Sequence, residues 1–135
     1  MQGVSINHIK ITVSDFERSK KFYDKIFKEL GLRKMFSARE NSAWHGKIVG
    51  YGNDDYTFEI QEGTIKTKFN RKRIGLDHIA FTARSREMID EFHEFLMKSK
   101  VKCSPPREYS EYEKGYYAVF FEDPDGIILE LVYTP

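Results

Sequence analysis

The sequence predicts an α+β fold built from two copies of a βαβββ module, and three observations support this prediction. A short phrase occurs twice, as residues 7–14 (NHIKITVS) and again as residues 77–84 (DHIAFTAR). In both copies apolar residues alternate with polar or small ones, which is the period of a strand with one covered face. Each copy is followed by a helical pattern and then by short strands, the last of which carries a glutamate. Because a repeat of this length indicates a duplicated unit, we expect one module at about 4–65 and another at about 74–135, within a single domain, 1–135.

The first module is predicted to open with a strand at residues 4–13 and a helix at 14–30. A polar cap followed by an early acid begins the helix, apolar residues recur at spacings of three and four, and a glycine ends it. Three strands are expected to follow, at 32–37, 43–51 and 56–61. Because alternate residues of a strand face opposite sides, the aliphatic row beside His8 should meet the helix and His8 should face away from it.

The second module repeats this order. A strand is expected at 75–83, a helix at 85–100, and later strands at 118–121 and 127–132, joined by an Asp-Pro-Asp-Gly turn. His78 should again lie opposite the aliphatic row of its strand. The connection between the modules, residues 66–73, carries five basic residues and no acid. It is interpreted as a solvated connection or as a lip that attracts an anionic substrate.

The composition excludes several classes of protein. Hydrophobic residues at 40% and charged residues at 32% are typical of a globular protein, and a net charge of +1 gives no general reason to bind nucleic acid or an anionic membrane. No apolar run approaches the roughly 18 residues that span a bilayer, so we expect a cytoplasmic location. Cys103 is the single cysteine, which excludes a disulfide within the chain and gives no signal of a nucleophile.

Two histidines and two glutamates occupy matching places in the two modules. His8 and His78 are 70 positions apart, and Glu59 and Glu130 are 71 apart. A curved sheet can aim one residue from each of several strands at a common point. Because carboxylates on an apolar-walled surface are costly to leave unpaired, a divalent cation would stabilise both. Two imidazoles and two carboxylates suit Zn, Ni, Co, Mn or Fe(II), and without a thiolate they indicate an open catalytic site rather than a closed structural zinc site.

These residues resemble the vicinal oxygen chelate superfamily, the group of glyoxalases, fosfomycin- and bleomycin-resistance proteins and extradiol dioxygenases. The resemblance covers nearly the whole chain and rests on His8 in NHIKITVSD, Glu59 in FEI, His78 in LDHIAF and Glu130 in DPDGIILEL. It implies two βαβββ modules whose strands form a cupped mixed sheet around a divalent metal bound by these four residues. It also implies a homodimer acting on a small molecule, and some members build each site from two chains.

Among the subgroups, the chain is most similar to glyoxalase I type enzymes, because His, Glu, His and Glu stand at the four ligand positions. In that family the metal binds the oxygens of a hemithioacetal of methylglyoxal and stabilises the enediolate formed when a glutamate removes a proton from carbon. The resemblance implies Glu130 as the first candidate for this base and Glu59 as the second. Thr12 stands where bacterial glyoxalases carry an arginine that contacts glutathione, so the thiol is left open.

Four alternatives stay open. Fosfomycin-modifying enzymes carry a threonine where this chain has Lys10, and they lack the second glutamate ligand. A small extradiol-type dioxygenase would use His8, His78 and Glu130, with Glu59 crowding an open position. A CoA-ester epimerase has a similar layout, and the basic connection would meet its nucleotide tail. A non-catalytic drug- or metabolite-binding protein of the bleomycin-resistance kind would use the same cup without metal catalysis.

Three tyrosines and one further histidine are also candidates for the site. Tyr112, Tyr116 and Tyr117 lie in and beside a polar loop and would either form a lid over the metal or cover an edge of the sheet. His45 lies in a predicted strand and would either line the cup or pack half-exposed.

Overall fold

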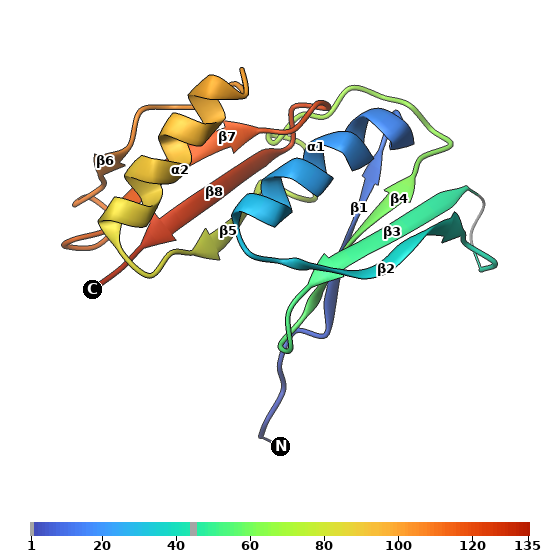
Figure 1. Ribbon diagram of the computed structural model, residues 1–135, viewed down its shortest axis with the longest axis horizontal. Helices are drawn as coiled ribbons and strands as arrows, with labels where there is room; N and C mark the ends of the chain where they lie inside the picture. The colour runs from blue at the N-terminus through green and yellow to red at the C-terminus, as the bar shows by residue number, and fades with distance from the viewer. Residues whose placement is uncertain (1, 44–45) are drawn as a thin grey trace. The chain divides into compact units, whose positions relative to one another are not determined.

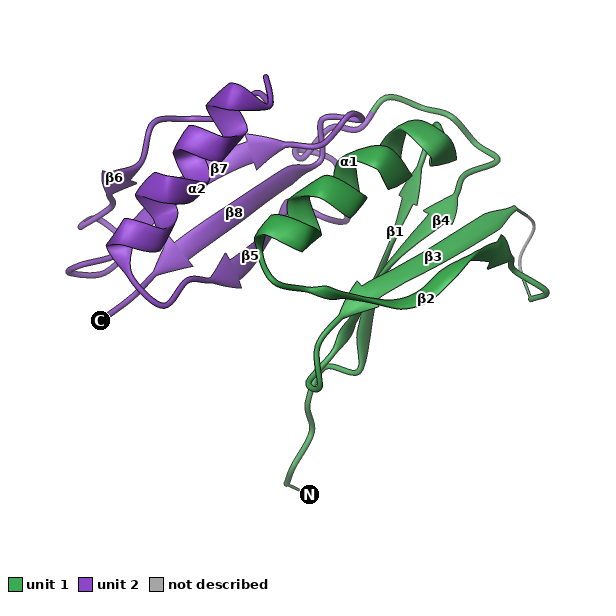
Figure 2. Cartoon of the chain, in the orientation of Figure 1, with its two compact units in different colours: residues 1–68 green, residues 69–135 purple. Residues whose placement is uncertain are grey.

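The computed structural model of the chain describes residues 2–43 and 46–135, so His45 lies outside the described residues. The chain divides into two compact units, residues 1–68 and residues 69–135 (Figure 2). Each unit contains one helix and one four-stranded sheet (Figure 1). The predicted α+β fold of two βαβββ modules is therefore confirmed, whereas the single domain at 1–135 stays a prediction.

In the first unit, a mixed sheet has the strand order β1-β4-β3-β2. Its elements are β1 (His8–Val13), α1 (Phe16–Glu29), β2 (Arg33–Glu40), β3 (Lys47–Gly52) and β4 (Thr57–Glu62). The strand with the histidine, β1, pairs in parallel with the strand that carries the glutamate, β4, and the other pairs are antiparallel. Asp15 caps α1 by accepting a hydrogen bond from the Arg18 N–H, as the sequence predicted.

The second unit has the same topology, with the strand order β5-β8-β7-β6. Its elements are β5 (His78–Thr82), α2 (Arg86–Lys98), β6 (Arg107–Glu108), β7 (Tyr117–Glu122) and β8 (Ile128–Tyr133). The histidine strand β5 again pairs in parallel with the glutamate strand β8. Ser85 caps α2 by accepting a hydrogen bond from the Met88 N–H.

One face of each sheet packs against its helix and forms a core. In the first unit Phe27 of α1 packs against Phe58 of β4, with their ring centroids 5.0 Å apart. In the second unit Phe92 of α2 packs against Phe121 of β7 at 5.3 Å. The opposite face of each sheet is the one on which the histidine and the glutamate lie. We call it the open face.

Several boundaries differ from the sequence prediction: β2 ends at Glu40 rather than at residue 37, β3 begins at Lys47 rather than at 43, and β5 begins at His78 rather than at 75. The first strand begins at His8 rather than at residue 4, because its ladder with β4 starts at the pair of His8 and Thr57. Val4 and Ile6, which would share one face of a strand that began at residue 4, are exposed. The sequence prediction named no residues for the edge strand of the second module, β6, which is two residues long and begins directly after Pro105 and Pro106.

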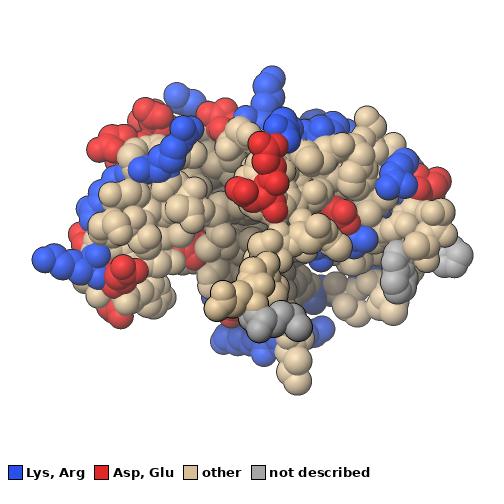
Figure 3. Space-filling model, turned by 90° about the horizontal axis from the view of Figure 1, so that it is seen from below, with Lys and Arg blue, Asp and Glu red and all other residues tan. Residues whose placement is uncertain are grey.

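The surface of the protein carries charges of both signs. Figure 3 shows acidic and basic side chains near one another over both units on the face in view, in keeping with the net charge of +1. Neither α1 nor α2 is long and apolar enough to cross a membrane, and these are the helices of the described residues.

A glycine on β3 makes room for an aromatic ring beside Glu59. Gly50 pairs with Glu59 on one side and with Phe36 of β2 on the other. A Cβ atom at position 50 would lie 2.3 Å from the Phe36 ring, which is well inside contact distance. We therefore expect Gly50→Ala to lower the free energy of unfolding by about 1 to 3 kcal/mol, as overpacking generally does.

Urea denaturation of four proteins tests this expectation. The proteins are the wild type, Gly50→Ala, Phe36→Ala and the double variant. If the ring is the obstacle, Gly50→Ala will cost much less in the Phe36→Ala background. Equal costs in both backgrounds would show that the Phe36 ring is not the cause.

Candidate metal centre

On the open face of the second unit, an imidazole meets a buried carboxylate. His78 on β5 pairs across the strands with Ile128 of β8, and Ala80 pairs with Glu130. The His78 Nε2 atom lies 3.1 Å from the Glu130 Oε2 atom. Glu130 is 1% exposed, so its charge is largely removed from water. A buried carboxylate needs a partner, and here the His78 ring nitrogen is in place either to donate an Nε2–H to it or to share a metal ion with it.

A second carboxylate holds the other nitrogen of the same ring. The His78 Nδ1 atom lies 2.6 Å from the Asp77 Oδ1 atom. Asp77 also accepts two hydrogen bonds from Arg71, from Nη2 at 2.5 Å and from Nε at 3.3 Å. These bonds from Arg71, and then the bond from His78, lower the pKa of Asp77 to about 2. Asp77 is therefore a carboxylate at neutral pH, and it can only accept from His78.

Tyr116 supplies the other partner of Glu130. Its hydroxyl group donates a hydrogen bond to Glu130 Oε1 at 2.5 Å. Burial, followed by this hydrogen bond, raises the pKa of Tyr116, so the phenol keeps its proton as a donor. Both oxygens of Glu130 thus have partners, one a hydroxyl group and the other an imidazole.

Aromatic rings extend from this pair along the open face. Phe120 pairs with Glu130 across β7 and β8, and its ring lies 6.0 Å from the His78 ring. Tyr109 packs against Phe120 at 5.6 Å, and Tyr112 packs against Tyr116 at 5.4 Å. The pair of His78 and Glu130 is therefore bordered by an aromatic surface.

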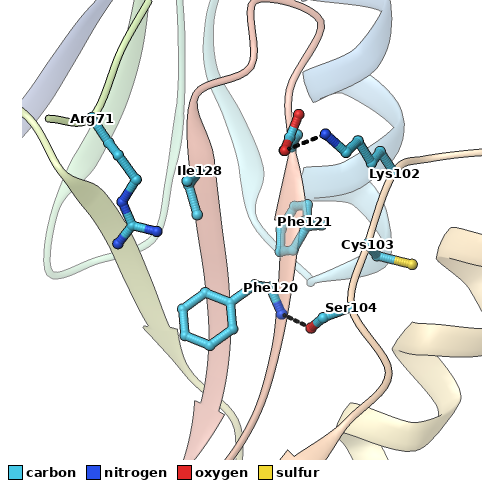
Figure 4. A pocket seen from close by; sticks show the side chains of 8 residues that line it. Arg71, Lys102, Cys103, Ser104, Phe120, Phe121 and Ile128 are labelled. Carbon is cyan, nitrogen blue, oxygen red and sulfur yellow. Dashed lines mark hydrogen bonds and ion pairs between the residues drawn. The ribbon is translucent and has the colours of Figure 1, made fainter.

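The second unit also has a hollow of about 270 Å³, whose lining includes neither His78 nor Glu130 (Figure 4). Phe120 and Ile128, the cross-strand partners of Glu130 and His78, line it. Arg71 and Lys102 bring positive charge to the same hollow, and Lys102 forms an ion pair with Glu122 at 2.9 Å. Both cations of the hollow are thus paired with carboxylates, Arg71 with Asp77 and Lys102 with Glu122, while Phe120 and Ile128 give it an apolar side.

The corresponding pair in the first unit has different surroundings. His8 and Glu59 lie on the same face of β1 and β4, and Glu59 is directly opposite Lys10. The Lys10 ammonium group lies 3.2 Å from Glu59 Oε2, and the Glu59 side chain is 16% exposed. The His8 Nδ1 atom contacts the Asn7 Oδ1 atom at 2.8 Å. The first carboxylate thus has a lysine as partner where the second has a histidine and a tyrosine.

The structure places the four predicted ligands as two pairs, one on the open face of each unit. His78 and Glu130 are in contact, and His8 and Glu59 share a face. Within the described part of either unit, no three His, Cys, Asp or Glu side chains gather closely enough to hold a metal ion. The assignment of all four residues to one metal therefore stays a prediction.

Sequence reasoning missed three contacts in these surroundings: Tyr116 with Glu130, Lys10 with Glu59, and Asp77 with His78. The contact of Asp77 with His78 could have been predicted from the repeated phrase, because a polar residue, Asn7 or Asp77, directly precedes each histidine. Of the three tyrosines considered as a lid, Tyr116 reaches the site. Tyr117 instead donates a hydrogen bond to Asp90 of α2 at 2.7 Å, so its hydroxyl group faces the helix.

Comparison with known proteins supplies independent information. The family model described as the Glyoxalase/Bleomycin resistance protein/Dioxygenase superfamily matches residues 5–131. The protein YqjT of Bacillus subtilis is 34% identical and aligns over 94% of this chain and 97% of its own length. The metallothiol transferase FosB of Lysinibacillus sphaericus is 27% identical over 90% of this chain and 77% of its own.

A solved structure supports the fold. The fosfomycin resistance protein FosX of Listeria monocytogenes, in a complex with Mn(II) and dihydroxypropylphosphonic acid, superposes with a TM-score of 0.69. It is 23% identical, and the match covers 97% of this chain and 91% of that one.

Replacing Tyr116 by Phe tests the hydrogen bond to Glu130. We expect Tyr116→Phe to lower the free energy of unfolding by about 1.5 to 3 kcal/mol, the usual range for a hydrogen bond to a charged group. The matched control is Tyr112→Phe, because Tyr112 is 67% exposed and should lose less than about 0.5 kcal/mol. Urea denaturation at pH 7 measures both, and equal losses would contradict the assigned role of the Tyr116 hydroxyl group.

Replacing Arg71 by Gln tests the ion pair with Asp77. Since the Arg71 bonds are the largest cause of the lowered pKa, Arg71→Gln should raise the pKa of Asp77 from about 2 toward its ordinary value near 3.9. The stabilisation that comes with the low pKa is present above pH 4 and is lost as the pH falls toward 2. Carbon NMR of the Asp77 carboxyl group measures the shift. Lys72→Gln removes the same charge from the neighbouring residue and should leave the pKa of Asp77 nearly unchanged.

Proposed function

Since the chain belongs to the Glyoxalase/Bleomycin resistance protein/Dioxygenase superfamily, we propose that it is a divalent-metal-dependent enzyme of the glyoxalase I type. It would act on the hemithioacetal of a 2-oxoaldehyde, with His8, Glu59, His78 and Glu130 as ligands of one metal ion. The observation that carries the proposal is the buried Glu130 carboxylate facing His78 Nε2 at 3.1 Å.

The donor set fits a divalent metal. With a metal bound, His78 would donate Nδ1–H to Asp77 and would offer its Nε2 lone pair to the metal on the side of Glu130. The His8 Nδ1 atom likewise contacts the residue before it, Asn7, so its Nε2 atom would be the one that binds the metal. Nitrogen and carboxylate ligands without a thiolate suit Zn, Ni, Co, Mn or Fe. A metal bound there would supply a Lewis acid that polarises the oxygens of the substrate.

The protein's own residues would position the substrate and move the proton. Glu130 is the first candidate for the base that removes a proton from carbon, and since Tyr116 holds its Oε1 atom, the Oε2 atom that faces His78 would accept the proton. Glu59 is the second candidate, because its carboxylate already forms an ion pair with the Lys10 ammonium group. The apolar side of the hollow, Phe120 and Ile128, would exclude water from the reacting carbon. We also propose that the protein forms a homodimer.

A second candidate function is thiol transfer, which the similarity to FosB suggests. The specific observation in its favour is the ion pair between Lys10 and Glu59. If this pair persists, His8, His78 and Glu130 are left as a set of three ligands. In that case Glu59→Gln would leave the metal affinity unchanged, whereas the four-ligand arrangement predicts a clear loss.

Metal loading and a substrate panel test the proposal. Protein purified without chelator should contain close to one equivalent of a divalent metal by elemental analysis. Metal-loaded protein incubated with methylglyoxal and a series of low-molecular-weight thiols should form a thioester. Glu130→Gln should abolish turnover, and the matched control Thr12→Ala, on the open face of β1, should retain most of it.

Each outcome decides between the candidates. Equal losses in Glu130→Gln and Thr12→Ala would contradict the role of Glu130 as base. Metal binding without thioester formation, together with thiol addition to an epoxide such as fosfomycin, would favour thiol transfer. Metal below about one-tenth of an equivalent, with no uptake by calorimetry, would favour a non-catalytic binding protein.

A further inference from the structure

Both histidines are held at Nδ1 by the residue that precedes them, but the two partners differ in charge. Asn7 contacts His8 at 2.8 Å, and Asp77 contacts His78 at 2.6 Å. These are corresponding positions of the repeat, so the backbone gives both partners the same approach. The first partner is a neutral amide and the second is a carboxylate.

This difference matters for the ring. A carboxylate is an acceptor only, so Asp77 requires a proton on Nδ1 and keeps the Nε2 lone pair free for a metal. A side-chain amide can present either its oxygen or its NH₂ group, so Asn7 fixes its ring less strictly. A carboxylate partner also makes an imidazole a stronger ligand, and removing such partners typically costs 10- to 100-fold in metal affinity.

Asp77 is itself held in place, although 56% of its side chain is exposed. Arg71 binds both of its oxygens through a forked pair of donors. A turn presents Arg71 to Asp77, because the Asn70 side chain accepts from the Lys72 N–H and the Asn70 carbonyl accepts from the Arg73 N–H. The basic connection between the modules thus fixes the orientation of Asp77, and Figure 4 shows Arg71 beside the strand of Ile128.

We infer that Asp77, held by Arg71, is a positioning residue that makes His78 the stronger of the two histidine ligands. The inference deepens the proposed function and rests on it. It assigns to the basic connection a role in the strength of the metal centre, in addition to a possible contact with substrate.

Zinc affinity of the full-length protein, measured by competition with a chromophoric chelator, tests the inference. Asp77→Ala should weaken zinc binding about 10- to 100-fold. Asp77→Asn, which gives His78 the partner of His8, should fall between Asp77→Ala and the wild type. Asn7→Ala should cost less than Asp77→Ala, and Asn7→Asp should bind zinc more tightly than the wild type.

Two further measurements separate orientation from a general effect of charge. Glu91→Gln removes an exposed carboxylate from α2 and should leave zinc affinity within about twofold. Long-range proton–nitrogen NMR should show a proton on His78 Nδ1 in the wild type and its loss or exchange between the two nitrogens in Asp77→Ala. An Asp77→Ala protein with unchanged zinc affinity and an unchanged His78 ring would overturn the inference.

The same experiments distinguish failure of the proposed function from failure of this inference. A wild-type protein that binds no zinc or other divalent metal contradicts the metal centre itself, whereas the state of the His78 ring in metal-free protein still tests whether Asp77 positions the imidazole. In that protein the Nδ1 proton should still depend on Asp77. If the proton occupies the same position on the His78 ring in metal-free wild type and in metal-free Asp77→Ala, the positioning role of Asp77 is contradicted.

Discussion

The parallel pairing of β5 with β8 is the constraint on which the surroundings of Glu130 depend. In this register Ala80 lies opposite Glu130, and His78, two residues earlier on β5, reaches the carboxylate. A slip of one residue would turn Glu130 toward α2, where Leu129 and Leu131 are now buried, and would place a charge in the apolar core. The alternation of apolar and polar residues that builds the core therefore also aligns the imidazole with the carboxylate.

The two units use one backbone plan with different side chains at corresponding places. Beside the glutamate, Lys10 of the first unit replaces Ala80 of the second. The small Ala80 leaves Glu130 to His78 and Tyr116, whereas Lys10 forms an ion pair with the more exposed Glu59. Duplication thus preserved the directions in which the side chains point, while the charges around the two carboxylates diverged.

Much of this arrangement could be predicted from sequence because it depends on local patterns. Period-two alternation located the strands of His8 and His78, a polar cap located the first helix, and the repeat of this pattern located the second helix; both helices lie within about two residues of the prediction. The contact between Tyr116 and Glu130 could not be predicted in this way, since 14 positions separate the residues and the contact depends on how β7 and its preceding loop align with β8. The pairing of Lys10 with Glu59 likewise depends on a parallel register that composition does not determine.

The short turn at residues 70–73 limits how the connection between the modules can vary. Because Arg71 and Asp77 are six positions apart and bound to each other, the intervening residues form a closed loop rather than a slack tether. A peptide tag or reporter domain inserted before residue 69 would leave this loop intact. The same insertion after Arg71 would lengthen the loop and increase the entropic cost of closing it. Engineered fusions of this protein should therefore be joined on the amino-terminal side of the arginine.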